Sequence, residues 1–134
     1  MEYISTAGIV IKHKKVFLAL RNPGGAQGDR WEFPGGKVDP GETPEEGLKR
    51  EYQEEFGIDL KVEDLFLESQ FTNGSKHFKL LAFLAQMDRK IPRILTEHQA
   101  AKWFKLEDMD ALRLADSDMP IYEYLIENRR AFNL

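Results

Sequence analysis

The feature that most constrains the fold is the run between Gly36 and Ile58, GKVDPGETPEEGLKREYQEEFGI. Thr43 with Glu46 three residues later forms the pattern of a capping box, and Pro44 suits the first position of a helix. Gly57 is placed to end that helix in the left-handed conformation. The run therefore predicts one helix with both ends marked. Three of its apolar residues share a stripe and are expected to face a core: Leu48, Tyr52 and Phe56.

The same helix carries Glu51, Glu54 and Glu55 on one side, because residues three and four apart are neighbours on a helix. Like charges at that spacing repel by about a few tenths of a kcal/mol per pair, and the fold does not require them. Carboxylate oxygens are the ligands of hard cations such as Mg²⁺ and Ca²⁺. The helix therefore predicts one side of a metal site. Gly47 falls among these glutamates, and either chance or the close approach of another group would explain it.

Composition limits the classes of partner. The 134 residues are 42% hydrophobic and 31% charged, which is typical of one globular domain spanning residues 1–134. The formal net charge of −4 provides no basic surface for a long nucleic acid. A small anionic ligand is compatible with it if a bound cation bridges the ligand to the acidic helix.

The chain has no cysteine, which excludes disulfides, thiolate zinc sites and thiol nucleophiles. The first residues lack the basic leader of a signal peptide, and the longest apolar run, 80–85, is too short to cross a bilayer. We therefore expect a cytoplasmic protein with no membrane partner. His13, His77 and His98 have no spacing typical of a zinc site and are expected to be structural or exposed.

The remaining pattern predicts mainly strands. Residues 3–12 and 15–21 are expected to form a hairpin, followed by a loop at 22–30 and a short extended piece at 31–33. Strands at 65–72 and 77–87 flank the turn signal Asn73-Gly74, and a short strand is expected at 102–106. A helical turn at 108–112 precedes a final helix at 117–130, with Ile121, Tyr124, Leu125 and Ile126 expected toward the core. Two helices covering a mixed sheet give an α+β or α/β sandwich.

One set of spaced residues resembles a known family motif, the Nudix box. The matching residues are Gly36, Glu42, Arg50, Glu51, Glu54, Glu55, Gly57 and Ile58. Tyr52 departs from the aliphatic residue usual in the family, and Gly47 stands where alanine is common. The stretches WEFPGGK, TEHQAAKWF and ADSDMPIYEYL resemble the MutT branch, so the similarity covers essentially the whole chain. The resemblance implies a Nudix α/β/α sandwich with a mixed β-sheet. It also implies Mg²⁺-dependent hydrolysis, with Mn²⁺ as an alternative ion, that releases a nucleoside monophosphate and pyrophosphate.

The resemblance also implies roles for individual residues. Its metal ligands would be the main-chain carbonyl of Gly35 and the carboxylates of Glu51, Glu54, Glu55 and Glu97. Either Glu51 or Glu97 would be the base that takes a proton from water, and Glu54 belongs with them in the catalytic set. Arg50 would support these carboxylates, because a guanidinium can bind them in a bidentate manner. Glu42 would brace the loop against the helix.

The substrate contacts implied by the resemblance lie outside the box. Arg21, Lys37 and Lys76 would meet the phosphates, and Phe33 and Asp118 would receive the base. An ionised Asp118 can only accept hydrogen bonds, so it would favour a base that donates them. MutT itself has an amide at this position. Plain structural roles compete with these: surface charges for the lysines and Glu97, core packing for Phe33, and a helix N-terminal acid for Asp118.

The leading hypothesis is therefore a pyrophosphohydrolase that removes damaged nucleotides from the pool, with oxidised dGTP as the first candidate substrate. A cytidine-type triphosphate is the second candidate, and ADP-ribose or another nucleoside diphosphate derivative fits less well. A nucleotide sensor without turnover is a further alternative, although such domains commonly lose box glutamates and this chain retains them. The protein is expected to be a monomer or a homodimer.

Overall fold

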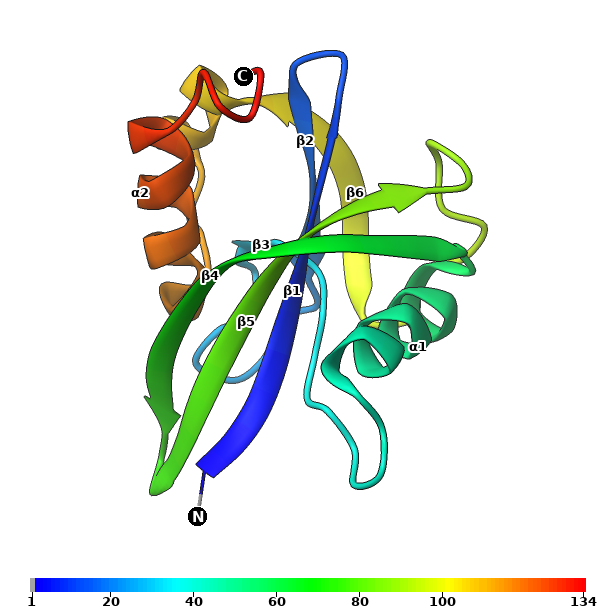
Figure 1. Ribbon diagram of the computed structural model, residues 1–134, viewed down its shortest axis with the longest axis vertical. Coiled ribbons are helices and arrows are strands. Elements are labelled where there is room, and N and C mark those ends of the chain that lie inside the picture. Colours follow the sequence, from blue (N-terminus) through cyan, green and yellow to red (C-terminus); the bar gives the residue numbers. More distant parts are fainter. Residues whose placement is uncertain (1) are drawn as a thin grey trace.

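The computed structural model describes residues 2–134, which form a six-stranded sheet and two α-helices (Figure 1). Two 3₁₀ turns precede the last helix. In chain order the elements are β1 (Glu2–Lys12), β2 (Lys15–Arg21), β3 (Trp31–Glu32), α1 (Pro44–Phe56), β4 (Leu60–Asn73), β5 (Lys76–Met87), β6 (His98–Lys105), η1 (Leu106–Ala111), η2 (Asp116–Asp118) and α2 (Met119–Glu127).

The sheet is mixed, as the sequence predicts. Its order is β3-β2-β1-β5-β4, and β6 pairs with β2. β1 runs parallel to β5, from the pair Glu2↔His77 to the pair Val10↔Ala85. The pairs β4–β5, β2–β3 and β2–β6 are antiparallel. The hairpin expected between β1 and β2 is present, but its register pairs only Ile11↔Val16 and Lys12↔Lys15 because β1 then turns to β5.

Neighbouring residues of the central strands pack into opposite cores. On β1, Ile9 belongs to the core beneath α2, whereas Val10 belongs to the core beneath α1. On β2, Leu18 belongs to the core beneath α2, and Phe17 belongs to the core beneath α1. Because successive side chains of a strand point to opposite faces, the alternation places α1 and α2 on opposite sides of the sheet, as Figure 1 shows. The α/β/α sandwich expected from the sequence is confirmed.

Helix α1 begins and ends where the sequence predicts. Thr43 accepts a hydrogen bond from the Glu46 amide while the Glu46 carboxylate accepts one from the Thr43 amide, which completes the capping box. Gly57 ends the helix with φ = 63°. Tyr52, the departure from the family pattern, is buried and its hydroxyl donates to the Gly8 carbonyl at 3.1 Å. The prediction that Tyr52 faces the core is confirmed.

Other boundaries differ from the expected ones because pairing decides them. β4 begins at Leu60 because residues 60–62 pair with β5. β6 begins at His98 because the residues before 102 pair with β2. The hairpin turn falls on residues 74–75, one position later than expected. In α2, Tyr122 is buried and Ile126 is 42% exposed, so the expectation for Ile126 is wrong.

Helices α1 and α2 have 13 and nine residues. Within residues 2–134, neither helix has the length and apolar character needed to cross a membrane.

Candidate active site

A cleft of about 440 Å³ lies between α1, the loop after β3 and the start of β6. It brings together seven of the residues that the sequence analysis assigned to a site: Arg21, Gly35, Lys37, Glu51, Glu54, Glu55 and Glu97. Four separate stretches of the chain therefore meet at one acidic hollow. The structure places Phe33, Lys76 and Asp118 elsewhere, as described below.

The loop at 34–38 reaches the cleft because it is hydrogen-bonded along β1. Thr6 donates its amide to the Gly36 carbonyl at 2.9 Å, and its hydroxyl donates to the same oxygen at 3.1 Å. On the other side, a Cβ at Gly36 would lie 2.6 Å from the carboxyl carbon of Glu51. The loop thus passes directly over Glu51, and a side chain at residue 36 would force the Glu51 carboxylate to move.

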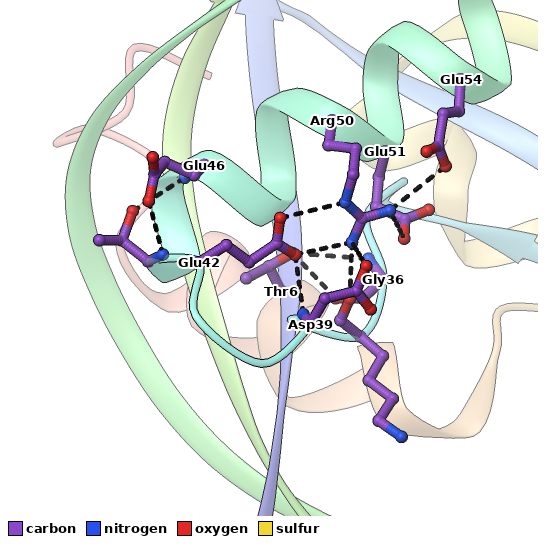
Figure 2. A network of polar contacts seen from close by, with 10 residues as sticks. Thr6, Gly36, Asp39, Glu42, Glu46, Arg50, Glu51 and Glu54 are labelled. Atoms are coloured by element: carbon purple, nitrogen blue, oxygen red, sulfur yellow. Dashed lines mark hydrogen bonds and ion pairs between the residues drawn. The ribbon is translucent and has the colours of Figure 1, made fainter.

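Arg50 organises the acidic side of α1 (Figure 2). Its Nε and Nη2 donate to the two carboxylate oxygens of Glu42 at 3.1 and 2.8 Å, and its Nη1 donates to Glu51 at 3.0 Å and Glu54 at 3.2 Å. The hydrogen bond from Arg50 is the main cause that lowers the pKa of Glu42. Gly47 allows this arrangement, since a Cβ there would lie 2.9 Å from Glu42 Oε1. The close approach considered for Gly47 is therefore real.

Glu55 differs from its neighbours because it is buried. It is 6% exposed, whereas the Glu54 side chain is 59% exposed. Burial, and next the adjacent Glu51, raises the pKa of Glu55 to about 10. Its Oε2 has no hydrogen-bond partner among the described residues. A bound cation would give this buried carboxyl oxygen the partner that it lacks, and would favour the ionised form of the carboxyl.

Glu97 reaches the cleft on a segment that caps the C-terminal end of α1. Arg93 and Thr96 donate their amides to the carbonyls of Phe56 and Glu55 at 2.9 and 3.4 Å. The Arg93 guanidinium also donates to the Gly57 carbonyl at 2.6 Å. These bonds satisfy carbonyls that a helix end leaves without partners. They also fix the position of Glu97 relative to the glutamates of α1.

Two residues of the cleft escaped the sequence analysis, Glu32 and His98. His98 is 5% exposed, and its Nε2 lies 2.7 Å from Glu32 Oε2. Its ring stacks on Phe56 with centroids 5.1 Å apart. The expectation that His98 is structural or exposed missed its place in the cleft wall, because Glu32 lies 66 positions away in the sequence. The one available signal was that His98 directly follows Glu97.

The basic residues are divided between two environments. Arg21 donates to Glu32 Oε1 at 3.0 Å at the edge of the cleft. Lys37 and Lys76 both lie over the ring of Tyr3. The ammonium nitrogen of Lys37 is 4.6 Å from the ring centroid, and that of Lys76 is 5.4 Å from it. Lys76 is exposed and does not line the cleft, and it lies near Lys37 because both side chains pack on Tyr3.

Phe33 and Asp118 line a second hollow of about 200 Å³. Phe33 is 2% exposed and packs in the core beneath α2, while its amide donates to Asp118 Oδ2 at 2.9 Å. Burial raises the pKa of Asp118 well above its usual value. This burial favours the protonated form of Asp118, and a protonated carboxyl can donate one hydrogen bond as well as accept one.

The donor set of the cleft fits a metal ion. Glu32, Glu55 and His98 each offer a ligand atom, and these atoms lie within 4.8 Å of one another. Glu51, Glu54 and Glu97 add carboxylates around the same hollow. Oxygen ligands suit hard divalent cations and imidazole suits transition metals.

Comparisons with known proteins agree with this arrangement. The model of the NUDIX domain matches residues 2–125. An 8-oxo-dGTP diphosphatase of Proteus vulgaris is 50% identical over 82 residues, which are 61% of this chain and 73% of that protein. The CTP pyrophosphohydrolase of Escherichia coli K12 is 33% identical over 125 residues, 93% of this chain and 92% of that protein. The crystal structure of a MutT NUDIX hydrolase from Burkholderia pseudomallei superposes with a TM-score of 0.80 at 25% identity, covering 92% of this chain and 97% of that one.

Proposed function

Because this chain belongs to the NUDIX family of hydrolases, we propose that it hydrolyses a nucleoside triphosphate to the monophosphate and pyrophosphate. The resemblance to the Nudix box and to MutT proteins drawn from the sequence is confirmed. Oxidised dGTP is the leading substrate, since a 50% identical relative is an 8-oxo-dGTP diphosphatase.

The observation that supports this proposal best is that the two hollows lie next to each other. The acidic cleft and the hollow at Asp118 share four lining residues: Arg21, Glu32, Gly35 and Gly36. The two hollows are therefore neighbours, and a nucleotide with its phosphates over α1 would extend its base toward Asp118. The side of Phe33 would form part of the second hollow, and Lys37 and Lys76 would meet outer phosphate oxygens.

We propose Mg²⁺ as the resident ion, with Mn²⁺ as an alternative. The carboxylates of Glu51, Glu54, Glu55 and Glu97 and the Gly35 carbonyl would hold it. When bound, such an ion neutralises charge on the phosphate oxygens and lowers the pKa of an attacking water.

The side chains of the cleft would have separate tasks in the reaction. Arg50 holds Glu51 and Glu54 in place, so neither carboxylate must be ordered when substrate arrives. Glu51 or Glu97 would accept the proton of the attacking water. The exposed Glu54 would face the phosphates, whereas the buried Glu55 forms the floor of the cleft.

Asp118 would contribute to the choice of base. In its protonated form it would donate to an acceptor such as guanine O6, while its other oxygen stays bonded to the Phe33 amide. Cytosine also presents acceptors on its pairing edge. A cytidine triphosphate is the second candidate, because the CTP pyrophosphohydrolase relative covers 93% of this chain.

The test is a panel of (d)NTPs, oxidised (d)NTPs, ADP-ribose and dinucleotides, ranked by kcat/KM, because discrimination between substrates is a ratio of these values. We expect oxidised dGTP or CTP to rank first. Glu54→Gln should abolish turnover and keep the fold by circular dichroism. Preference for ADP-ribose over every triphosphate would overturn the proposal, and no turnover on any member would favour a nucleotide sensor.

We further propose that the protein works in the cytoplasm, as one domain, on small nucleotides and not on long nucleic acids or membranes. Its assembly would be a monomer or a homodimer, which light scattering of the purified protein distinguishes.

A further inference from the structure

Glu32, His98 and Glu55 lie close together in the lining of the cleft. Glu32 uses both of its oxygens, one for Arg21 at 3.0 Å and the other for His98 Nε2 at 2.7 Å. A carboxylate only accepts hydrogen bonds, so Nε2 carries the hydrogen and donates. The other ring nitrogen, Nδ1, is then left with a free lone pair.

That lone pair faces Glu55 and has no partner. His98 Nδ1 and Glu55 Oε2 are both buried without a hydrogen bond among the described residues. Nδ1 lies 3.8 Å from Glu55 Oε1, too far for a hydrogen bond. Two ligand atoms each about 2.0–2.2 Å from one shared ion lie about 3–4 Å apart. The separation of these two atoms therefore suits a shared cation.

We propose that His98 supplies a nitrogen ligand, through Nδ1, to a metal ion that it shares with Glu55, and that Glu32 orients the ring for this purpose. A histidine that binds a metal commonly donates its other N–H to a carboxylate, which fixes its tautomer and orientation. Because imidazole suits transition metals, the site takes Mn²⁺, Co²⁺ or Zn²⁺ at this position as well as a hard ion at the carboxylates. The inference rests on the proposed metal role of Glu55.

The direct test is pulsed electron paramagnetic resonance of the protein with Mn²⁺ alone, without nucleotide. We expect modulation from one coupled nitrogen, whose frequency changes when the protein is grown with ¹⁵N-histidine. This measurement needs no variant, so it does not depend on whether a buried substitution folds. His98→Asn should remove the coupling and weaken Mn²⁺ binding by about 10- to 100-fold. Its Mg²⁺ affinity should change less.

Two further variants separate a ligand from a packing residue. Glu32→Gln keeps the imidazole, so the coupling should persist while Mn²⁺ affinity falls. His77→Gln alters an exposed histidine of β5 and should change neither quantity. Absence of nitrogen coupling in the unaltered protein, its persistence in His98→Asn, or absence of Mn²⁺ binding would each overturn the inference.

These experiments distinguish failure of the His98 ligand assignment from failure of the proposed function. Nitrogen coupling without turnover on the nucleotide panel would reject the pyrophosphohydrolase and leave the ligand assignment intact. Turnover with Mg²⁺ but no nitrogen coupling would reject the His98 ligand alone.

Discussion

Arg50 and Glu42 are joined by two parallel hydrogen bonds, 3.1 and 2.8 Å long, between a residue in the middle of α1 and one in the loop before it. Asp39 donates its amide to the same Glu42 carboxylate at 2.7 Å. The pair therefore ties the loop that carries Gly35 and Gly36 to the helix that carries the acidic residues. This bidentate contact adds to the hydrogen bonds by which β1 holds the same loop.

Arg50→Lys is expected to reduce kcat by about 10- to 100-fold, because an ammonium group cannot make the bidentate contact to Glu42 and still reach Glu51. KM for the nucleotide should change less, since Arg50 acts on the carboxylates. Lys49→Arg, at the adjacent exposed position, is the matched control and should have no effect. Full activity in Arg50→Lys would show that the network is dispensable.

Gly36→Ala is expected to preserve the fold and lower turnover by about 100-fold, the scale of a 1 Å misplacement in an active site. The new methyl group would lie 2.6 Å from the Glu51 carboxyl carbon, so that side chain must move. Circular dichroism should show an intact α1, while Mn²⁺ affinity measured by calorimetry should fall. Unchanged metal affinity would mean that Glu51 is not a ligand.

Asp118→Asn is expected to flatten the dependence of stability on pH. Burial raises the folded-state pKa of Asp118, so above the usual pKa of 3.8 the unfolded chain loses a proton that the folded protein keeps. The free energy of unfolding therefore falls as pH rises through the window between these two pKa values, by up to about 1.4 kcal/mol per pH unit. An asparagine cannot ionise, so in urea titrations the variant should gain stability relative to the parent as the pH rises above the usual aspartate pKa. Parallel curves for the two proteins would contradict the burial argument.

Arg93→Ala is expected to lower turnover by about tenfold with little loss of thermal stability. Its exposed side chain donates to the Gly57 carbonyl and helps hold the segment that positions Glu97. Arg89→Ala is the matched control, because among residues 2–134 the Arg89 side chain bonds within its own segment, to the Ile91 carbonyl. Equal rates for both variants would indicate that the main-chain bonds to α1 suffice.

Local chemistry explains what could be predicted from the sequence. The limits of α1 follow from Thr43, Pro44 and Gly57, each of which acts on backbone within one helical turn. The acidic cluster follows from helical spacing alone. Family resemblance then supplied Gly35 and Glu97, which the fold brings to the same cleft.

What could not be predicted depends on distant partners. The start of β6 is set by pairing with β2, and the burial of His98 is set by Phe56 and Glu32 from other elements. The raised pKa of Asp118 comes from its burial and from the distant Glu32, and not from its neighbours in the chain. The spacing of residues in a sequence does not predict such long-range contacts unless the residues belong to a known family motif.

The parallel register between β1 and β5 has a consequence for how the chain is made. Nine residues of β1 pair with residues 75 positions later, so during synthesis they have no partner until β5 has emerged from the ribosome. During that interval β1 presents unpaired backbone and apolar side chains, which is a condition that favours aggregation. Yield in a cell should therefore respond to growth temperature and chaperone supply before it responds to changes in the acidic cleft.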